Sequence, residues 1–364
     1  MLQGLPGVRK SSAIGVGTEL LRKAGYVRFA PDRMSRQSFL DELWRLNQPD
    51  FLGLASMDDL MDMQLNYPYE MSIHAKEFID FIGQGDKDYL MLLTNLWDNL
   101  DEYNNPKISS RSVLVSEPTI NLLSASTPEN LNMAFPSNVM DTGTLSRMLF
   151  IHSPPTGRKI LIPQRGNEEN CSDVVRQLRE MKEVCSGEAT LSKAAYDALE
   201  YIYNHQQPLD DQRFLYYSSR RLTHLFKLCL IIAASRLTTQ IEEYDVLLAN
   251  TILVAAEMQM PKALGHFGRS KQAAINHSIL DYLEDRGVPV PIKTLYNVFA
   301  ADFNKEADFQ GALYDLQSAG KLAAVKLSNN LTGLTTVGTV LPDWTKDLLL
   351  LDALTAQERS ALGV

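Results

Sequence analysis

The sequence has few cysteines and no long apolar run. Only Cys171, Cys185 and Cys229 occur among 364 residues, an odd number without the spacing of a metal site. No stretch of about 18 apolar residues is present, and the most apolar segment, LFKLCLIIAA at 225–234, is bracketed by arginines. The N-terminus lacks the charged, apolar and small-residue series of a signal peptide. These absences predict no membrane span and favour a reducing cytoplasm.

Positive charge is also scarce. The chain carries 35 Lys and Arg against 44 Asp and Glu, a net charge of −9. Affinity for a phosphate backbone comes from Lys and Arg that neutralise phosphates, so this balance excludes a generally basic nucleic-acid-binding coat. Any contact with nucleic acid must therefore be local.

The chain is long enough for two or three domains, and its character changes along its length. Strand and helix patterns alternate up to residue 165, which predicts an α/β core. Residues 166–262 are almost entirely helical by period, which predicts a helical lid. Residues 272–341 show three helices and then two β-rich runs, the order of a winged helix. Residues 342–364 are expected to form a short amphipathic tail helix, so the chain is mainly helical overall.

The periodicity predicts individual elements within the α/β region. A helix is expected over 12–23, a short strand over 26–29, and a helix with Ser35 as its N-cap. A strand running into a helix is expected over 69–83, and a strongly periodic helix over 87–103.

The N-terminal segment GLPGVRKSS resembles a phosphate-binding loop. In G-x-x-x-x-G-K-[ST] the backbone amides surround a phosphate, the lysine reaches the β- and γ-phosphates, and the hydroxyl binds magnesium. Gly4, Lys10 and Ser11 have this spacing, and Gly7 helps the backbone to bend around a phosphate. Arg9, however, occupies the position of the last glycine of the motif. The alternative is an ordinary turn that caps a helix. The candidate nucleotide-binding residues are Gly4, Gly7, Arg9, Lys10, Ser11 and Ser12, with Ser11 as the Mg²⁺ ligand.

Further segments follow this loop in a recognisable order: YEMSIHAKEFIDFIG, LLTNLWDNLDEY, PTINLLSASTPENL and GTLSRMLFIHSPPTGRK. The ordered set resembles phage- and plasmid-encoded replication ATPases, which are similar to ring-forming AAA+ helicases, including the minichromosome-maintenance type. The resemblance covers roughly residues 1–260. It implies an α/β P-loop NTPase core and an ATP- and Mg²⁺-dependent DNA helicase or translocase. It also implies a homo-oligomeric ring, with six subunits, that hydrolyses ATP between subunits in the cytoplasm of a bacterial host.

The resemblance implies roles for particular residues. Glu77 matches the Walker B glutamate that polarises the attacking water, although Lys76 replaces the acidic residue usual before it. Ser126 matches the sensor that contacts the γ-phosphate, with its neighbour Thr127 as an alternative. Arg147 matches the arginine finger donated to a neighbouring subunit's ATP. The ordinary alternatives are a helix N-terminal carboxylate, a helix cap and a surface arginine.

Two other assignments have rivals. Arg220 matches the second sensor, directed toward the phosphates, and Arg221 is its alternative. Asp58 and Asp59 form a rival Walker B pair, ranked second because a helical segment follows them. The expected catalytic set is Lys10, Glu77, Arg147 and Arg220.

The acidic chain needs a local DNA contact, and NNPKISSRSVLVSEP supplies one. Lys107 and Arg111 lie where the resembled helicases carry a β-hairpin that projects into the central pore. Repeated around a ring, these cations would hold single-stranded DNA without sequence preference. The third helix expected in the winged helix is acidic, which favours contact with other replication proteins there and through the tail.

Two other functions remain open. The first is a nucleotide-switch helicase loader or replication-initiation ATPase without unwinding activity, favoured by Arg9, Lys76 and the short segment before the loop. The second is a pseudo-ATPase that serves only as an interaction module. The histidines show no metal pattern, and His74 is expected to be a core residue.

Overall fold

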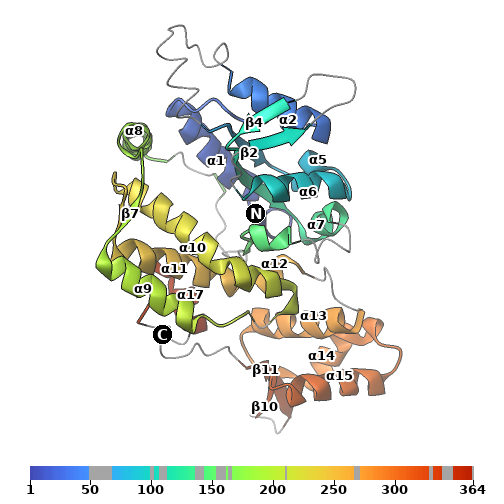
Figure 1. Cartoon of the computed structure of the whole chain (residues 1–364). Coiled ribbons are helices and arrows are strands. Elements are labelled where there is room, and N and C mark those ends of the chain that lie inside the picture. Colours follow the sequence, from blue (N-terminus) through green and yellow to red (C-terminus); the bar gives the residue numbers. More distant parts are fainter. Residues whose placement is uncertain are drawn as a thin grey trace, which may run out of the picture. The chain divides into compact units, whose positions relative to one another are not determined.

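The computed structural model describes residues 1–48, 68–98, 102–105, 113–135, 143–152, 161–162, 166–209, 211–265, 271–327, 331–337 and 347–362. The chain forms two compact units (Figure 1). The first consists of Met1–Leu264 and Leu348–Ala353, and the second of Gly265–Asp347 and Leu354–Val364. The first unit combines a parallel sheet with helices, and the second combines helices with a small antiparallel sheet. The expected mainly helical α/β class is therefore confirmed.

A four-stranded parallel sheet lies at the centre of the first unit, with the strand order β2-β5-β1-β6. Its strands are β1 (Leu2–Gln3), β2 (Glu70–Ala75), β5 (Thr119–Ser126) and β6 (Ile151–His152). Although β1 has two residues, it lies inside the sheet, where Leu2 pairs with both Ala125 and Ile151. The chain leaves β1 toward β2 and later returns to the other side of β1. In open parallel sheets, ligands bind beyond the carboxyl ends of the strands at such a switch point.

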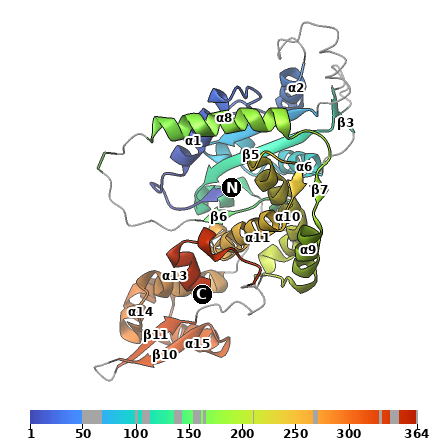
Figure 2. The ribbon, with the colours of Figure 1, turned by 90° about the vertical axis from the view of Figure 1, so that its left-hand side faces the viewer.

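Helices cover the sheet and extend from it. α1 (Lys10–Lys23) packs against β2 and β5, and α8 (Glu168–Val184) lies along α1 (Figure 2). α2 (Arg36–Leu46) begins after Ser35, whose side chain accepts a hydrogen bond from the Ser38 amide, as expected. The shorter helices around it are α5 (Phe78–Ile82), α6 (Lys87–Leu96) and α7 (Pro128–Ala134). The fully buried rings of Phe39, Phe81 and Tyr89 join α2, α5 and α6.

Three local expectations need correction. α1 begins at Lys10, two residues before the expected start. The expected strand over 26–29 is reduced to one bridge between Phe29 and Ser72. The helix expected to reach residue 103 ends at Leu96, and β3 (Glu102–Asn105) pairs antiparallel with β4 (Val113–Ser116). The segment after Leu96 is rich in Asn and Asp, which compete for backbone hydrogen bonds and favour helix ends.

The helical block joins the sheet in the same unit. It contains α9 (Lys193–His205), α10 (Leu215–Ser235), α11 (Glu243–Glu257) and α12 (Met260–Ala263), as the periodicity predicts. The two-residue strands β7 (Thr190–Leu191) and β8 (Gln240–Ile241) pair in parallel beside them. The 3₁₀ segment η2 (Leu145–Arg147), which precedes β6 in the chain, packs against α10.

Part of the tail docks on α11 rather than forming one amphipathic helix. The Asn250 side chain donates to the Leu348 carbonyl at 3.1 Å, and the Leu350 amide donates to Thr251 Oγ1 at 2.9 Å. The tail's described helical elements are the 3₁₀ turn η5 (Leu351–Ala353) and α17 (Ala356–Leu362).

The second unit has its own core. α13 (Lys271–Arg286), α14 (Ile292–Phe299) and α15 (Glu306–Ser318) accompany a sheet of order β10-β11-β9. The strands are β9 (Val290–Pro291), β10 (Leu322–Lys326) and β11 (Thr332–Thr336). Its buried cluster includes Ile279, Leu295, Phe309 and Leu334. The element order agrees with the expected helices and hairpin, and its assignment as a winged helix stays a prediction.

None of the helices among the described residues combines the length and apolar character needed to cross a bilayer.

Candidate functional site

The loop after β1 turns directly into the first turn of α1. Arg9 takes a left-handed conformation, with φ 63° and ψ 26°, at the N-cap of α1. A side chain in this conformation costs about 1–2 kcal/mol relative to glycine, so the chain keeps a loop geometry that glycine would favour. The Lys10 ammonium donates to the carbonyls of Gly4 at 2.8 Å and Leu5 at 3.0 Å. The loop is thus curled around its own lysine. No side chain caps the N-terminus of α1, where the first amides of a helix favour an anion.

The strand register brings other predicted residues to the edge where this loop begins. Gln3, the last residue of β1, pairs with Ser126 of β5. Ala75 of β2 pairs with Ser124, and Glu77 follows Ala75 by two residues. β5 separates β1 from β2, so the loop and Glu77 belong to strands about 10 Å apart. The structure therefore places the loop, Ser126 and Glu77 along one carboxyl edge.

Glu77 and Thr127 differ in what their side chains do. Glu77 occupies the N-cap position of α5, but its carboxylate makes no capping hydrogen bond there. Instead, Glu77 Oε2 accepts a hydrogen bond from Asn130 Nδ2 at 3.3 Å. Thr127 caps α7 by accepting from the Asn130 amide, while the fully buried Ser126 hydroxyl donates to the Thr127 carbonyl. Both sensor candidates are therefore engaged, Thr127 as a helix cap and Ser126 with the Thr127 carbonyl.

Gln3 is a polar residue at this edge that the sequence analysis did not identify. Its side chain is 2% exposed, and neither the amide nitrogen nor the amide oxygen has a hydrogen-bond partner among the described residues. Gln3 pairs with Ser126 on one side and His152 on the other. A buried amide without partners costs about 1–3 kcal/mol, so this position suits an additional polar group such as a water or a ligand.

Arg147 and Arg220 meet at a second location, around Trp97 and Asp98. Arg147 Nη2 lies 2.7 Å from Asp98 Oδ2, and Arg220 Nη1 lies 3.4 Å from Asp98 Oδ1. The two guanidinium carbons are 5.6 and 5.5 Å from the Trp97 ring centroid. Lys227 joins them with its ammonium 3.6 Å from that centroid. We call these five residues the Trp97 cluster. Sequence order gives no signal for Asp98 or Lys227, because α6 and α10 are far apart in the chain.

α10 holds this cluster against η2. His224 Nε2 lies 2.9 Å from the carbonyl of Ser146, the residue before Arg147, so Nε2 must carry the proton that it donates. Burial lowers the pKa of His224, which keeps the ring neutral in the Nε2–H form. Burial likewise lowers the pKa of Lys227, partly offset by Asp98. The backbone of Arg147 is therefore fixed to the helix that carries Arg220.

Arg221, the alternative to Arg220, belongs to the interior. Its Nε lies 2.7 Å from Glu257 Oε1, and its Nη2 donates to Asn250 Oδ1 at 2.9 Å. Tyr217 also donates to Glu257, at 2.8 Å. All of these hydrogen bonds are buried and join α10 to α11. Arg221 therefore has a structural role, and Arg220 is the arginine that faces solvent.

Replacing Arg221 by methionine should lower the free energy of unfolding by about 3–5 kcal/mol, because it leaves the Glu257 carboxylate buried without its cation. Urea denaturation of the whole chain measures this difference. Arg220→Met is the matched substitution one residue earlier, and its partly exposed pair should contribute less than about 1 kcal/mol. Equal losses for the two variants would contradict the assignment.

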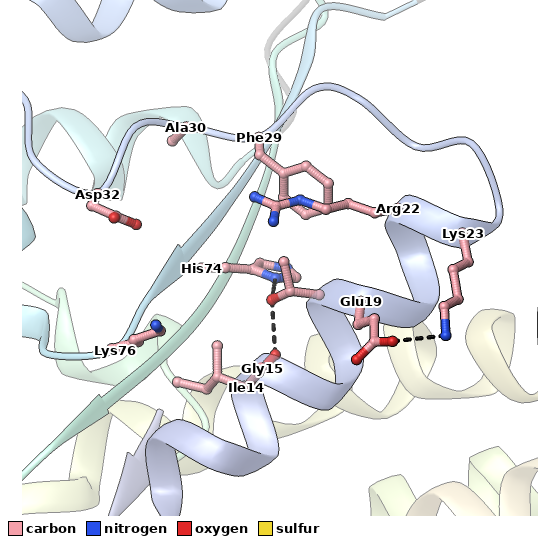
Figure 3. Close-up of a pocket in the computed structure, with 11 residues that line it drawn as sticks. Ile14, Gly15, Glu19, Arg22, Lys23, Phe29, Ala30, Asp32, His74 and Lys76 are labelled. Atoms are coloured by element: carbon pink, nitrogen blue, oxygen red, sulfur yellow. Dashed lines mark hydrogen bonds and ion pairs between the residues drawn. The ribbon is translucent and has the colours of Figure 1, made fainter. Parts of the chain in front are cut away.

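A pocket of about 610 Å³ lies beside α1 and β2 (Figure 3). His74 and Lys76 of the β2 region line it together with Arg22, which lies over the Phe29 ring at 5.2 Å. Thr18 Oγ1 donates to the Ile14 carbonyl, so His74 Nδ1, 2.7 Å away, is the donor to Thr18. Burial lowers the pKa of His74, so it is a neutral, half-buried residue that packs between α1 and β2.

Some predicted residues fall outside the described part of the chain. Lys107 and Arg111 lie between β3 and β4, and Asp58 and Asp59 lie in the segment 49–67. The pairing of β3 with β4 has the antiparallel sense that a hairpin requires.

Ser12 is exposed in the first turn of α1, and Gly7 has φ 86°, a conformation that favours glycine.

The residues at the loop suit a magnesium ion only in part. Ser11 is exposed at the start of α1 and offers a hydroxyl oxygen, and Glu77 offers a carboxylate on the same edge. Hard oxygen ligands of this kind are those Mg²⁺ prefers, usually with several waters. Lys76, the residue before Glu77, lines the pocket beside α1 and supplies a cation rather than a further carboxylate. Comparison of the sequence with protein-family models and with curated proteins finds no match.

Proposed function

We propose that this chain is an ATP-binding P-loop motor of the AAA+ type that assembles into a ring and moves along DNA. The observation that carries the proposal is the position of the loop. It leaves an interior strand at the switch point of a parallel sheet and opens directly into a helix N-terminus. Glu77 and Ser126 come from neighbouring positions on the same edge. Their spatial order supports the roles that the sequence resemblance implies.

In this proposal the loop amides and Lys10 bind the phosphates, and Ser11 holds the magnesium ion that neutralises their charge. Glu77 polarises the attacking water and is oriented by Asn130. The buried Ser126 hydroxyl and the buried, unpartnered amide of Gln3 are proposed to supply further polar groups at the γ-phosphate end. In this arrangement the phosphates, the magnesium ion and the attacking water would all lie at the carboxyl edge of β1, β5 and β2.

The Trp97 cluster supports the part of the proposal in which the chain forms an oligomer. Arg147 and Arg220 both contact Asp98, so one surface presents two guanidinium groups. We propose that this surface faces the ATP of a second copy, where fixed positive charge stabilises the transferring phosphoryl group. An interface between unlike surfaces closes into a ring when its rotation permits, and a hexamer is the expected size. Lys107 and Arg111 are proposed to hold the DNA in the pore.

The second candidate is a nucleotide switch that loads a helicase or starts replication. Arg9 in the left-handed conformation and Lys76 in place of an acid favour it, since both depart from an efficient hydrolytic site. Hydrolysis of ATP by the whole chain, with and without single-stranded DNA, separates the two functions. The motor requires hydrolysis that rises several-fold with DNA. ATP binding with slow hydrolysis that DNA does not change would support the switch instead.

A further inference from the structure

We propose that Arg147, Arg220 and Lys227, arranged against the Trp97 ring, form an anion site that the Asp98 carboxylate fills in the free chain. In the assembly, a phosphate group of the nucleotide held by a second copy takes the place of that carboxylate. This inference rests on the proposed function and adds Asp98 as an exchangeable counter-ion and Lys227 as a third ligand.

The charges of the cluster do not balance. Two arginines contact the Asp98 carboxylate and Lys227 lies over the same Trp97 ring, so the five residues carry three cations against one carboxylate. The face of an indole ring attracts cations, and it holds these three together despite their mutual repulsion. Lys227 is exposed, so its ammonium is accessible to an anion that approaches the cluster. An added anion therefore has a favourable place to bind.

Asp98 has the geometry that a phosphate would adopt. Arg147 contacts one carboxylate oxygen and Arg220 contacts the other, so two guanidinium groups bridge a two-oxygen edge. A phosphate presents an edge of two oxygens with more charge, and arginine recognises both groups in this way. Asp98 is 40% exposed, so the carboxylate can move aside into solvent.

Arg147 retains unused hydrogen-bonding capacity. Its Nη1 donates to the Gly143 carbonyl and its Nη2 to Asp98, but its buried Nε has no partner among the described residues. The Arg147 side chain is 12% exposed, so this orphan donor is costly. A tetrahedral anion offers more oxygens than a carboxylate and can engage such a donor.

The surface around the cluster suits a second copy of this chain as the source of the phosphate. α10 exposes Tyr216, Phe226, Leu230 and Ile231. At about 100° per residue, Tyr216 and Ile231 lie within about 40° of Arg220 and Lys227 around α10, so these two apolar side chains share a helix face with the two cations. Aromatic residues and arginine are enriched at protein interfaces, whereas a free polyphosphate would use only the cations.

The first experiment measures anion binding at the Trp97 cluster in a chain whose loop is impaired by Lys10→Ala. In a Lys10→Ala background, Asp98→Asn should raise the affinity for inorganic tripolyphosphate about tenfold in calorimetric titration, because it removes one competing negative charge. Adding Lys227→Gln should reverse this gain. Asp173→Asn removes an equivalent exposed carboxylate that pairs with Arg176 on α8, and it should have no effect. Asp98→Ser provides a second variant if Asp98→Asn does not fold. Unchanged affinity in a folded Asp98 variant, or an equal gain for Asp173→Asn, would overturn the anion site.

The second experiment tests whether the phosphate comes from another copy. Lys10→Ala has an altered loop and an intact Trp97 cluster. Lys227→Gln has an intact loop and an altered Trp97 cluster. Each alone should hydrolyse ATP poorly, and an equimolar mixture should recover a measurable fraction of the parent activity. No recovery, with a positive result in the first experiment, would limit the site to free anions. A parent chain without ATPase activity would refute the proposed motor, while the titration would still decide the anion site.

Discussion

Replacement of Arg147 by alanine is expected to lower ATP hydrolysis by about 10³-fold, while ATP binds with nearly parental affinity. Arg147 lies in the Trp97 cluster, where its side chain contacts Asp98, the Trp97 ring and the Gly143 carbonyl. We propose that it acts on a neighbouring copy's nucleotide. Its removal then leaves the chain's own loop intact. Steady-state hydrolysis and equilibrium titration with a fluorescent ATP analogue measure the two quantities separately.

Arg176→Ala is the matched control for Arg147, because it removes an exposed arginine from α8 with the same loss of charge. Its activity should stay within about twofold of the parent value, as expected for an exposed ion pair of small energy. Small additions of Arg147→Ala chains to parent chains should reduce activity more than simple dilution does. Normal hydrolysis by Arg147→Ala, or an equal loss of nucleotide binding, would contradict a role in the neighbouring site.

Glu77→Gln should reduce hydrolysis by about 10²–10⁴-fold, the usual contribution of a general base, while it leaves ATP bound. Glutamine keeps an oxygen that can accept the hydrogen bond from Asn130, so the local structure should persist. Single-turnover measurement of phosphate release reports the chemical step directly. Glu129→Gln, in the exposed first turn of α7, is the matched control and should remain active. Comparable activity of the two variants would remove Glu77 from the chemistry.

The sequence predicts local features of this protein well because they depend on residues close together in the chain. The amphipathic period of residues 12–23 predicts α1 except for its first two residues, and Ser35 marks the start of α2 with a capping hydrogen bond. The helical block follows from period alone. The predicted end of α6, at residue 103, was wrong. β3 takes its strand conformation from pairing with β4, and this pairing overrides the local helical periodicity.

The residues that meet at the candidate sites could be identified only from the tertiary structure. Adjacent residues on a helix differ in direction by about 100°, so the sequence could not choose between Arg220 and Arg221. Packing of α10 on α11 decides the choice, since it buries Arg221 against Glu257. Asp98 and Lys227 are separated by more than a hundred positions, and no local pattern brings them together. Gln3 appears as one polar residue before a glycine, and only the sheet register shows that it is buried beside Ser126.

The central claim is that the Gly4–Ser12 loop binds the phosphates of ATP. Calorimetric titration with Mg·ATP of the parent, Lys10→Ala and Lys23→Ala chains tests it most directly. Lys23 lies at the far end of α1 in an exposed pair with Glu19, so its loss should not matter. Lys10→Ala should weaken ATP binding at least about 30-fold, because a charge-assisted contact to phosphate contributes about 2 kcal/mol or more. Equal affinity of Lys10→Ala and Lys23→Ala chains, or no ATP binding by the parent, would contradict it.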